Sequence, residues 1–292
     1  MNNKNRKKGL EDMSTLEIFA RKLFKNKLAF VGLLFIIFLI VIALFAPLIA
    51  PDNPDKMSVS NSLLGIGQKG HLLGTDNYGR DILSRLIFGA RISLIVGVGA
   101  VFVGAFIGVI LGIIAGYFGG FLDALIMRFM DALSAFPFIL LAIVLMTVLS
   151  SGLGNVIIAV GIGNIPGFAK IARGQVLATK ESDYIETTRS LGASSFRIIF
   201  NHILPNSAAP IIVYGTMNIA GAIISEAALS FLGLGIQPPT PSWGNMLKDG
   251  QDYLVVAPHL AFFSGLAILL SVLAFNVLGD GLRDALDPKT KL

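Results

Sequence analysis

Long runs without charged side chains constrain this chain more than any other feature of its sequence. Residues 28–50, 92–122, 132–169 and 254–279 contain no Asp, Glu, Lys or Arg. A helix needs roughly 20 apolar residues to cross the hydrocarbon core of a bilayer. The strict two-residue alternation of barrel strands is missing, so we expect these runs to cross the membrane as helices. The sequence therefore predicts an all-α integral membrane protein.

The number of spans follows from the lengths of these runs. The run 132–169 is too long for one helix, and small and polar residues at 150–155 break it, so we expect a helical hairpin there. Its second arm, at about 156–171, is the weakest candidate for a span. A further run, 207–234, is interrupted only by Glu226. We thus expect six transmembrane helices: 28–50, one within 92–122, the two arms of the hairpin, 207–234 and 254–279.

Composition excludes several classes of protein. Hydrophobic residues make up 54% of the 292 residues, charged residues only 14%, and the mean hydropathy is +0.76, values typical of a membrane protein. The chain has no cysteine, which rules out disulfides, thiolate metal sites and thiol catalysis. It also contains no GxxxxGK(S/T), HExxH or GxSxG motif, so we expect no enzymatic activity.

The positions of the basic residues predict the orientation in the membrane. Six spans place both termini on one side, and Lys and Arg concentrate on the cytoplasmic side of membrane proteins. The tails 1–27 and 281–292, the segment 170–206 and a turn near Arg128 hold most of the 23 Lys and Arg residues. The opposite side holds only Lys56, Lys69, Arg80, Arg85, Arg91 and Lys248. Both termini and 170–206 are therefore expected in the cytoplasm.

The same reasoning divides the chain into segments. The cytoplasmic tail 1–27 precedes a first transmembrane helix at 28–50. An extracytoplasmic segment, 51–90, follows, and a five-helix core at 91–280 contains the cytoplasmic segment 170–206.

The first half of this cytoplasmic segment predicts a short helix. Asp183 and Glu186 have the spacing of a capping box, so a helix is expected to begin there and to run to Leu191. Gly192 is well placed to end it, because a left-handed residue commonly follows the last turn of a helix.

The second half predicts another helix, which ends before Pro205. Its apolar positions recur at helical spacing and form one face, made by Phe196, Ile199, Phe200 and Ile203. The expected result is a helix-turn-helix along the membrane surface that presents Glu186, Arg189 and Arg197.

A resemblance gives this segment a function. Glu186-Thr187-Thr188 is followed after three residues by Gly192 and, nine residues later, by the sequence HILP at 202–205. This resembles the EAA loop of ABC importer permeases, whose pattern is EAA, three residues, G, nine residues and IxLP. Two departures are the threonines in place of the alanines and His202 in place of Ile. The spacing of Glu, Gly, Leu and Pro is intact.

Further matches point to one branch of these permeases. The chain resembles the dipeptide, oligopeptide and nickel permeases in LGTDNYGRD at 73–81, RGQVL at 173–177, EAALSFLGLG at 226–235 and PPTPSWG at 238–244. From about residue 28 onward, the order and lengths of the segments are similar to those of the "C"-type subunit. The resemblance implies a type I ABC importer transmembrane domain in the bacterial plasma membrane.

The resemblance also implies partners. In this family a permease forms the pathway with a second, homologous permease, two cytoplasmic ATPases bind ATP and Mg, and an extracytoplasmic binding protein delivers the substrate. This chain is thus expected to bind no cofactor and no nucleic acid. The residues expected to couple it to an ATPase are Glu186, Thr187, Thr188, Arg189, Gly192, Ala193, Leu204 and Pro205.

Two features of the spans have alternative interpretations. A row of glycines at every fourth position lets another helix approach closely, either within this subunit, which we favour, or in the partner permease. The row consists of Gly104, Gly108, Gly112 and Gly116. Glu226 lies within the fifth span, where a carboxylate is costly. It is expected either to make a polar contact in the bundle or to line the pathway.

The outer segments raise the question of a metal site. The loop carries candidate ligands, namely His71, Asp76, Asn77 and Asp81. Their spacing is not that of an EF-hand, and neighbouring glycines indicate turns, so we expect a structural role and no metal. Trp243 and Tyr253 are expected at the outer membrane interface.

Three functional hypotheses follow. The chain is a permease of an ABC importer for di- or oligopeptides, or for nickel or a metal chelate; it is a secondary transporter or channel that works alone; or it is a membrane scaffold without transport activity. The EAA-like segment and the scarcity of charge in the middle of the spans favour the first.

Overall fold

The computed structural model describes residues 15–286, so the expected tails 1–27 and 281–292 lie partly outside the described residues. Within that range every regular element is helical. The α-helices are α2 (Thr15–Lys25), α3 (Lys27–Leu44), α4 (Ala46–Ile49), α5 (Ile82–Phe118), α6 (Gly120–Ser134), α7 (Phe138–Leu149), α8 (Leu153–Lys180), α9 (Asp183–Ser190), α10 (Ser195–Ile198), α11 (Leu204–Phe231), α12 (Trp243–Gln251) and α13 (His259–Leu286). Two 3-10 turns, η1 (Val59–Asn61) and η2 (Gln68–Gly70), precede α5, and a π-turn, η3 (Ile199–Ile203), precedes α11.

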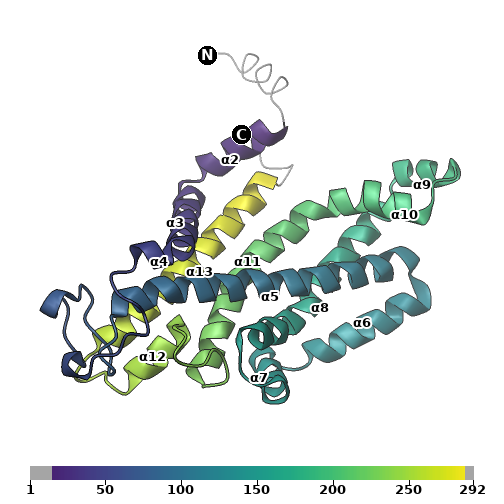
Figure 1. The fold of residues 1–292 in the computed structure, drawn as a ribbon. Coiled ribbons are helices and arrows are strands. Elements are labelled where there is room, and N and C mark those ends of the chain that lie inside the picture. Colours follow the sequence, from purple (N-terminus) through teal and green to yellow (C-terminus); the bar gives the residue numbers. More distant parts are fainter. Residues whose placement is uncertain (1–14, 287–292) are drawn as a thin grey trace, which may run out of the picture.

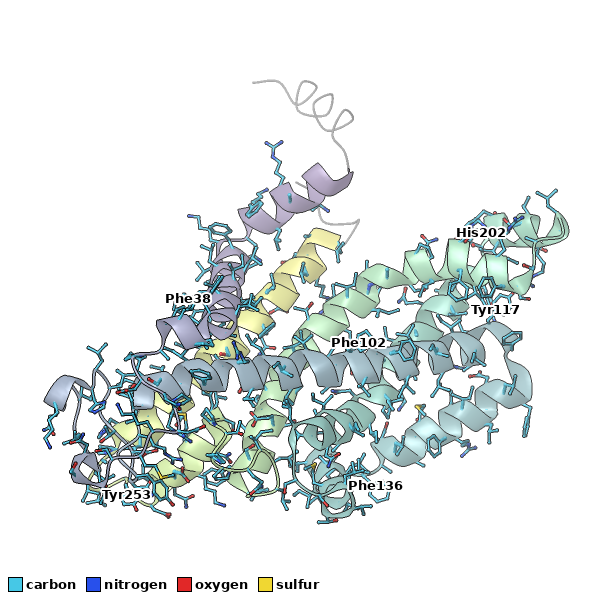
Figure 2. The ribbon with its side chains drawn as sticks, in the orientation of Figure 1. Phe38, Phe102, Tyr117, Phe136, His202 and Tyr253 are labelled. Atoms are coloured by element: carbon cyan, nitrogen blue, oxygen red, sulfur yellow. The ribbon has the colours of Figure 1, made fainter. Side chains whose placement is uncertain are left out.

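The helix lengths agree with the predicted membrane architecture. Five helices between residues 15 and 286 are long and apolar enough to cross a membrane, namely α3, α5, α8, the continuous helix Ser195–Phe231 and α13. A sixth candidate is the pair α6 and α7, bent by 91° at a short break. Phe136 lies at this bend (Figure 2). The predicted all-α membrane fold is confirmed, with six spans when this bent pair counts as one.

The helices form a bundle whose two ends differ (Figure 1). α5 packs along α8, and α11 contacts α5, α8 and α13. The loop between α4 and α5 lies with α12 at one end of the bundle, whereas α9 and α10 lie at the other. The distribution of basic residues makes the first end the outer one and the second the cytoplasmic one.

The weak apolar signal of the fourth span has a structural cause. α8 has the lowest mean hydropathy of the five spanning helices, 1.4, and its apolar window is the most buried, at 56% compared with 28% for α3 and α13. A helix enclosed by other helices contacts side chains rather than lipid and does not need an apolar surface all round. It also continues to Lys180, well past the expected end near 171.

The close approach of α5 and α8 depends on the glycine row. The structure places all four glycines against α8 of the same chain, where each is buried. A Cβ atom at Gly108 would lie 2.6 Å from the carbonyl oxygen of Ile165 and 2.7 Å from the Cβ of Phe168. Both distances are too short for carbon contacts, so any side chain at this position would push the two backbones apart.

The helix that contains the second span begins before the expected span. α5 starts at Ile82 rather than near 92, because Asp81 accepts a hydrogen bond from the Ser84 amide at 2.8 Å and caps the first turn. Arg85 is buried in this turn and donates to the carbonyl oxygen of Pro54 at 3.0 Å. These polar partners let α5 begin with charged residues, ahead of the charge-free run 92–122.

The carboxylates of the outer loop are engaged with basic side chains. Arg80 Nε donates to Asp76 Oδ2 at 2.6 Å, and Arg80 also lies 3.6 Å from Asp249 on α12. His71 Nδ1 lies 2.9 Å from Asp81 Oδ1. Burial raises the pKa of Asp249, and the nearby guanidinium of Arg80 opposes part of that rise. These pairs fasten the loop to α5 and α12, which is a structural role.

Trp243 begins α12 at the outer end of the molecule but is buried in the protein. This residue is only 2% exposed, and its indole N–H donates to the carbonyl oxygen of Leu86 at 3.0 Å. Gly89 on the next turn of α5 leaves room for the ring. The tryptophan therefore joins α12 to α5 inside the protein at the outer end of the bundle, instead of facing lipid. Tyr253 is partly buried at the outer end of the molecule (Figure 2).

The glycine row yields a matched test of this packing. We expect Gly108→Ala to destabilise the protein, since overpacking of a well-packed site costs about 1–3 kcal/mol. Gly221→Ala is the control, because a Cβ at that helical glycine meets no atom within 4 Å and alanine favours helix. Thermal unfolding of the purified protein in detergent measures both. If neither substitution changed the melting temperature, the close packing of α5 against α8 would be contradicted.

Candidate functional site

The cytoplasmic segment folds into a compact turn between two long helices. α9 follows α8 after a two-residue break, and Gly192 then reverses the chain with a φ of 83°. α10 begins at Ser195. The expected short helix at 183–191 and the glycine turn after it are thus present, at the far end of the bundle from α12 (Figure 1).

The start of α9 differs in detail from the expected capping box. The N-cap is Ser182, not Asp183, and no side chain bonds to the free amides of the first turn. The Ser182 hydroxyl donates instead to the carbonyl oxygen of Thr179 at 2.6 Å and so closes the end of α8. Asp183 and Glu186 both lie in the first turn of α9, where their negative charges interact favourably with the helix dipole and stabilise the helix.

The second helix does not end before Pro205, which corrects the prediction. α10, η3 and α11 form one continuous helix from Ser195 to Phe231. The Leu204 amide donates to the carbonyl oxygen of Ile199, five residues back, so the helix widens by one residue just before the proline. A wide turn accommodates the ring and the missing N–H that would otherwise break a regular helix.

The apolar face of this helix is also different from the expected one. The buried residues are Ile198 and Ile203, which pack with Ile185 of α9 and with residues of α5 and α8. Phe196 and Phe200 face outward, 69% and 49% exposed, with their ring centroids 4.3 Å apart. Regular α-helical spacing separates Ile198 from Ile203 by about 140°, and the π-turn brings them onto one side.

The exposed residues at this end form a surface that we name the cytoplasmic tip. It consists of Tyr184, Glu186, Arg189, Leu191, Phe196, Arg197 and Phe200, all of which are exposed. Leu191 is the extreme case, at 84%. Figure 2 shows Tyr117 and His202 at the same end of the molecule, and the Arg189 guanidinium lies over the Tyr117 ring at 5.8 Å. The tip therefore combines apolar and charged side chains at the cytoplasmic end of the bundle, ahead of the apolar run 207–234.

The other expected coupling residues lie beside the tip. The hydroxyl groups of Thr187 and Thr188 donate to the carbonyl oxygens four residues back in α9, at 2.8 and 2.6 Å. Ala193 and Leu204 are partly buried against the isoleucine cluster below the tip. Pro205 lies inside the continuous helix. The residues of the motif thus lie close together, some exposed on the tip and others partly buried beneath it.

Two side chains of α8 fasten this helix to its neighbours close to the tip, and neither contact was predicted from the sequence. Arg173 pairs with Asp123 of α6 through Nε at 2.5 Å and through Nη2 at 2.6 Å. Lys180 Nζ donates to the carbonyl oxygen of Gly116 near the end of α5, at 2.9 Å. The expected turn near Arg128 is in fact the helix α6.

Glu226 is enclosed by the helices of this chain. It has no exposed surface, and its two carboxylate oxygens accept from Ser230 at 2.7 Å and from Ser93 at 3.4 Å. Ser93 lies on α5, so the geometry is that of a polar contact within the bundle. Serine hydroxyls supply the hydrogen bonds that a buried carboxylate requires.

Comparison with known proteins identifies the family. The family described as "Binding-protein-dependent transport system inner membrane component" matches residues 108–292, which is well over half of the chain. The chain belongs to this family. A second family, "N-terminal TM domain of oligopeptide transport permease C", matches residues 14–65, so the C-type assignment also holds at the N-terminal end.

Two relatives align with this chain over almost its whole length. The Glutathione transport system permease protein GsiD of Escherichia coli O6:K15:H31 (strain 536 / UPEC) is 53% identical over 94% of this chain and 90% of that protein. GsiD of Shigella flexneri serotype 5b (strain 8401) is 54% identical over the same shares.

A solved structure shows the same fold. In an inward-facing conformation of the MetNI methionine ABC transporter, one chain matches with a TM-score of 0.57, over 69% of this chain and 96% of that one, at 18% identity. This family member is thus a multi-pass permease subunit of an ABC importer in the bacterial inner membrane, with the type I fold, and it is not itself an enzyme.

The Arg173 anchor yields a double-mutant test. Alanine substitutions of Arg173 and Asp123, singly and together, are expected to give a coupling energy of about 1–3 kcal/mol, because the pair is bidentate and partly buried. The pair Lys170 and Asp131 joins the same helices but is largely exposed, so its coupling is expected to stay below about 1 kcal/mol. Chemical unfolding in mixed micelles measures both cycles. Equal couplings would show that Arg173 is no stronger an anchor than Lys170.

Proposed function

We propose that this permease subunit transmits the motion of a cytoplasmic ATPase through the cytoplasmic tip, and that it forms the pathway for a short peptide with a second, homologous permease. The observation that carries the first part is the exposed apolar surface at the cytoplasmic end, ahead of the apolar run 207–234. Each large apolar side chain that leaves water contributes roughly 1.5–3 kcal/mol. Leu191, Phe196 and Phe200 therefore favour a protein partner at this end.

The tip suits the transmission of force because it is held from below. Ile185, Ile198 and Ile203 are buried under it, and the salt bridge of Arg173 fastens α8 to α6 close by. A packed element moves as a unit, whereas a flexible loop absorbs displacement. Glu186, Arg189 and Arg197 add charges that a complementary ATPase groove can recognise. ATP and Mg belong to that partner.

The substrate class rests on the relatives. Both are named as permeases of a glutathione transport system, and glutathione is a short peptide. We therefore propose di- and oligopeptides, delivered by an extracytoplasmic binding protein. The nickel or metal-chelate alternative finds no support in these names. Membership in an importer family likewise argues against a secondary transporter or channel that works alone.

The coupling role predicts a specific loss of function. Glu186→Lys and Gly192→Pro are expected to leave the protein in the membrane, to abolish uptake and to weaken copurification of the ATPase. The first reverses a charge on the tip, and the second places a ring where φ is positive. Uptake and pull-down of the complete transporter in membrane vesicles measure both effects.

Glu181→Lys is the matched control, because it makes the same charge change at an exposed position just outside the tip. It is expected to retain uptake. Normal transport by the Glu186→Lys variant would contradict the coupling role.

The substrate class is tested in proteoliposomes that contain the whole transporter and its binding protein. ATP-dependent accumulation of labelled glutathione or dipeptide is expected, and unlabelled peptide is expected to compete. Accumulation of nickel without peptide uptake would refute the peptide assignment while leaving the coupling assignment intact.

A further inference from the structure

A groove between α3 and α5 at the outer end of the spans is not explained by transport or by coupling. It measures about 590 Å³ and is lined by Ile40, Ala43, Leu44, Arg91, Leu94, Ile95, Val98 and Gly99. Every lining side chain except Arg91 is apolar. We propose that this groove binds one anionic phospholipid of the outer leaflet, with the lipid phosphate on Arg91 and an acyl chain along α5.

The position of Arg91 marks the level of the lipid headgroups. Its Nε donates to the carbonyl oxygen of Ala43 at 2.9 Å, and its Nη2 donates to that of Leu44 at 3.2 Å. Leu44 is the last residue of α3, and Arg91 directly precedes the charge-free run 92–122, so the guanidinium lies at the outer end of that run. The end of an apolar span coincides with the boundary between hydrocarbon and headgroups.

The guanidinium is held in place but is not neutralised. It donates hydrogen bonds to two carbonyl oxygens and lies 5.8 Å from the centroid of the Phe88 ring, and no carboxylate of residues 15–286 forms an ion pair with it. An unpaired positive charge next to hydrocarbon is costly and attracts an anion. Arginine also matches phosphate geometry through several N–H donors. A phosphate at this level of the membrane belongs to a lipid.

The rest of the groove has the direction that an acyl chain needs. Leu94, Ile95 and Val98 follow Arg91 at helical spacing, so they lie on the same side of α5 and lead from the outer end toward the middle of the membrane. From Arg91 to Gly99 the helix rises by about 12 Å. Ile95 and Val98 are 42% and 51% exposed, so the groove is open to the bilayer in the folded chain.

The test uses native mass spectrometry of the full-length chain in mild detergent. Added palmitoyl-oleoyl phosphatidylglycerol is expected to bind with one high-affinity lipid per chain, and phosphatidylcholine with the same acyl chains is expected to bind more weakly. Arg91→Gln is expected to lower the affinity for phosphatidylglycerol by about tenfold or more, the magnitude for loss of a charged hydrogen-bond partner. Arg128→Gln, which removes the same charge at an exposed position of α6, is expected to change nothing.

A second variant keeps the test valid if Arg91→Gln perturbs the fold. Val98→Trp fills the open part of the groove and leaves Arg91 intact, so it is also expected to lower the affinity. Equal binding of the two lipids, or unchanged binding in both variants, would overturn the proposal. Release of the lipid when the second permease assembles with this chain would also overturn it, because the groove would then be a subunit contact.

Discussion

The close contact of α5 with α8 is the interaction on which the rest of this structure depends. Four glycines remove every side chain from one stripe of α5, so α8 can approach its backbone directly. Dispersion forces act only at short range, and in a membrane they replace much of the hydrophobic effect that holds soluble helices together. The contact makes α8 the most enclosed spanning helix, and the enclosed helix then supports α9 and the cytoplasmic tip.

The outer end is organised by a different force. There the loop before α5 is held by buried or half-buried ion pairs, such as Arg80 with Asp76, and by a tryptophan whose indole joins α12 to α5. Such polar contacts are directional, so they fix the loop in one geometry. The bundle is thus held by two kinds of contact. Small residues pack α5 against α8, and charged side chains hold the outer loop.

The sequence predicted the spans because long uncharged runs have few structural solutions. It also predicted α9 and the turn at Gly192, since a left-handed residue leaves a local signature. It did not predict the π-turn before Pro205, because periodicity arguments assume a constant number of residues per turn. The same assumption placed Phe196 and Phe200 inside and left out Ile198. Arg173 and Trp243 were missed or misplaced because their partners, Asp123 and Leu86, are distant in the chain.

The unbroken passage through Pro205 has a mechanical meaning. The helix from Ser195 to Phe231 continues over 37 residues through a π-turn and Pro210, and at 1.5 Å per residue its length along the axis is about 55 Å. Its first turn carries Phe196, and its last turns carry the buried Glu226. When a helix of that length tilts by about 5° about its outer end, its cytoplasmic end moves by about 5 Å. A small rotation of this helix near Glu226 is therefore accompanied by a larger displacement of its cytoplasmic end.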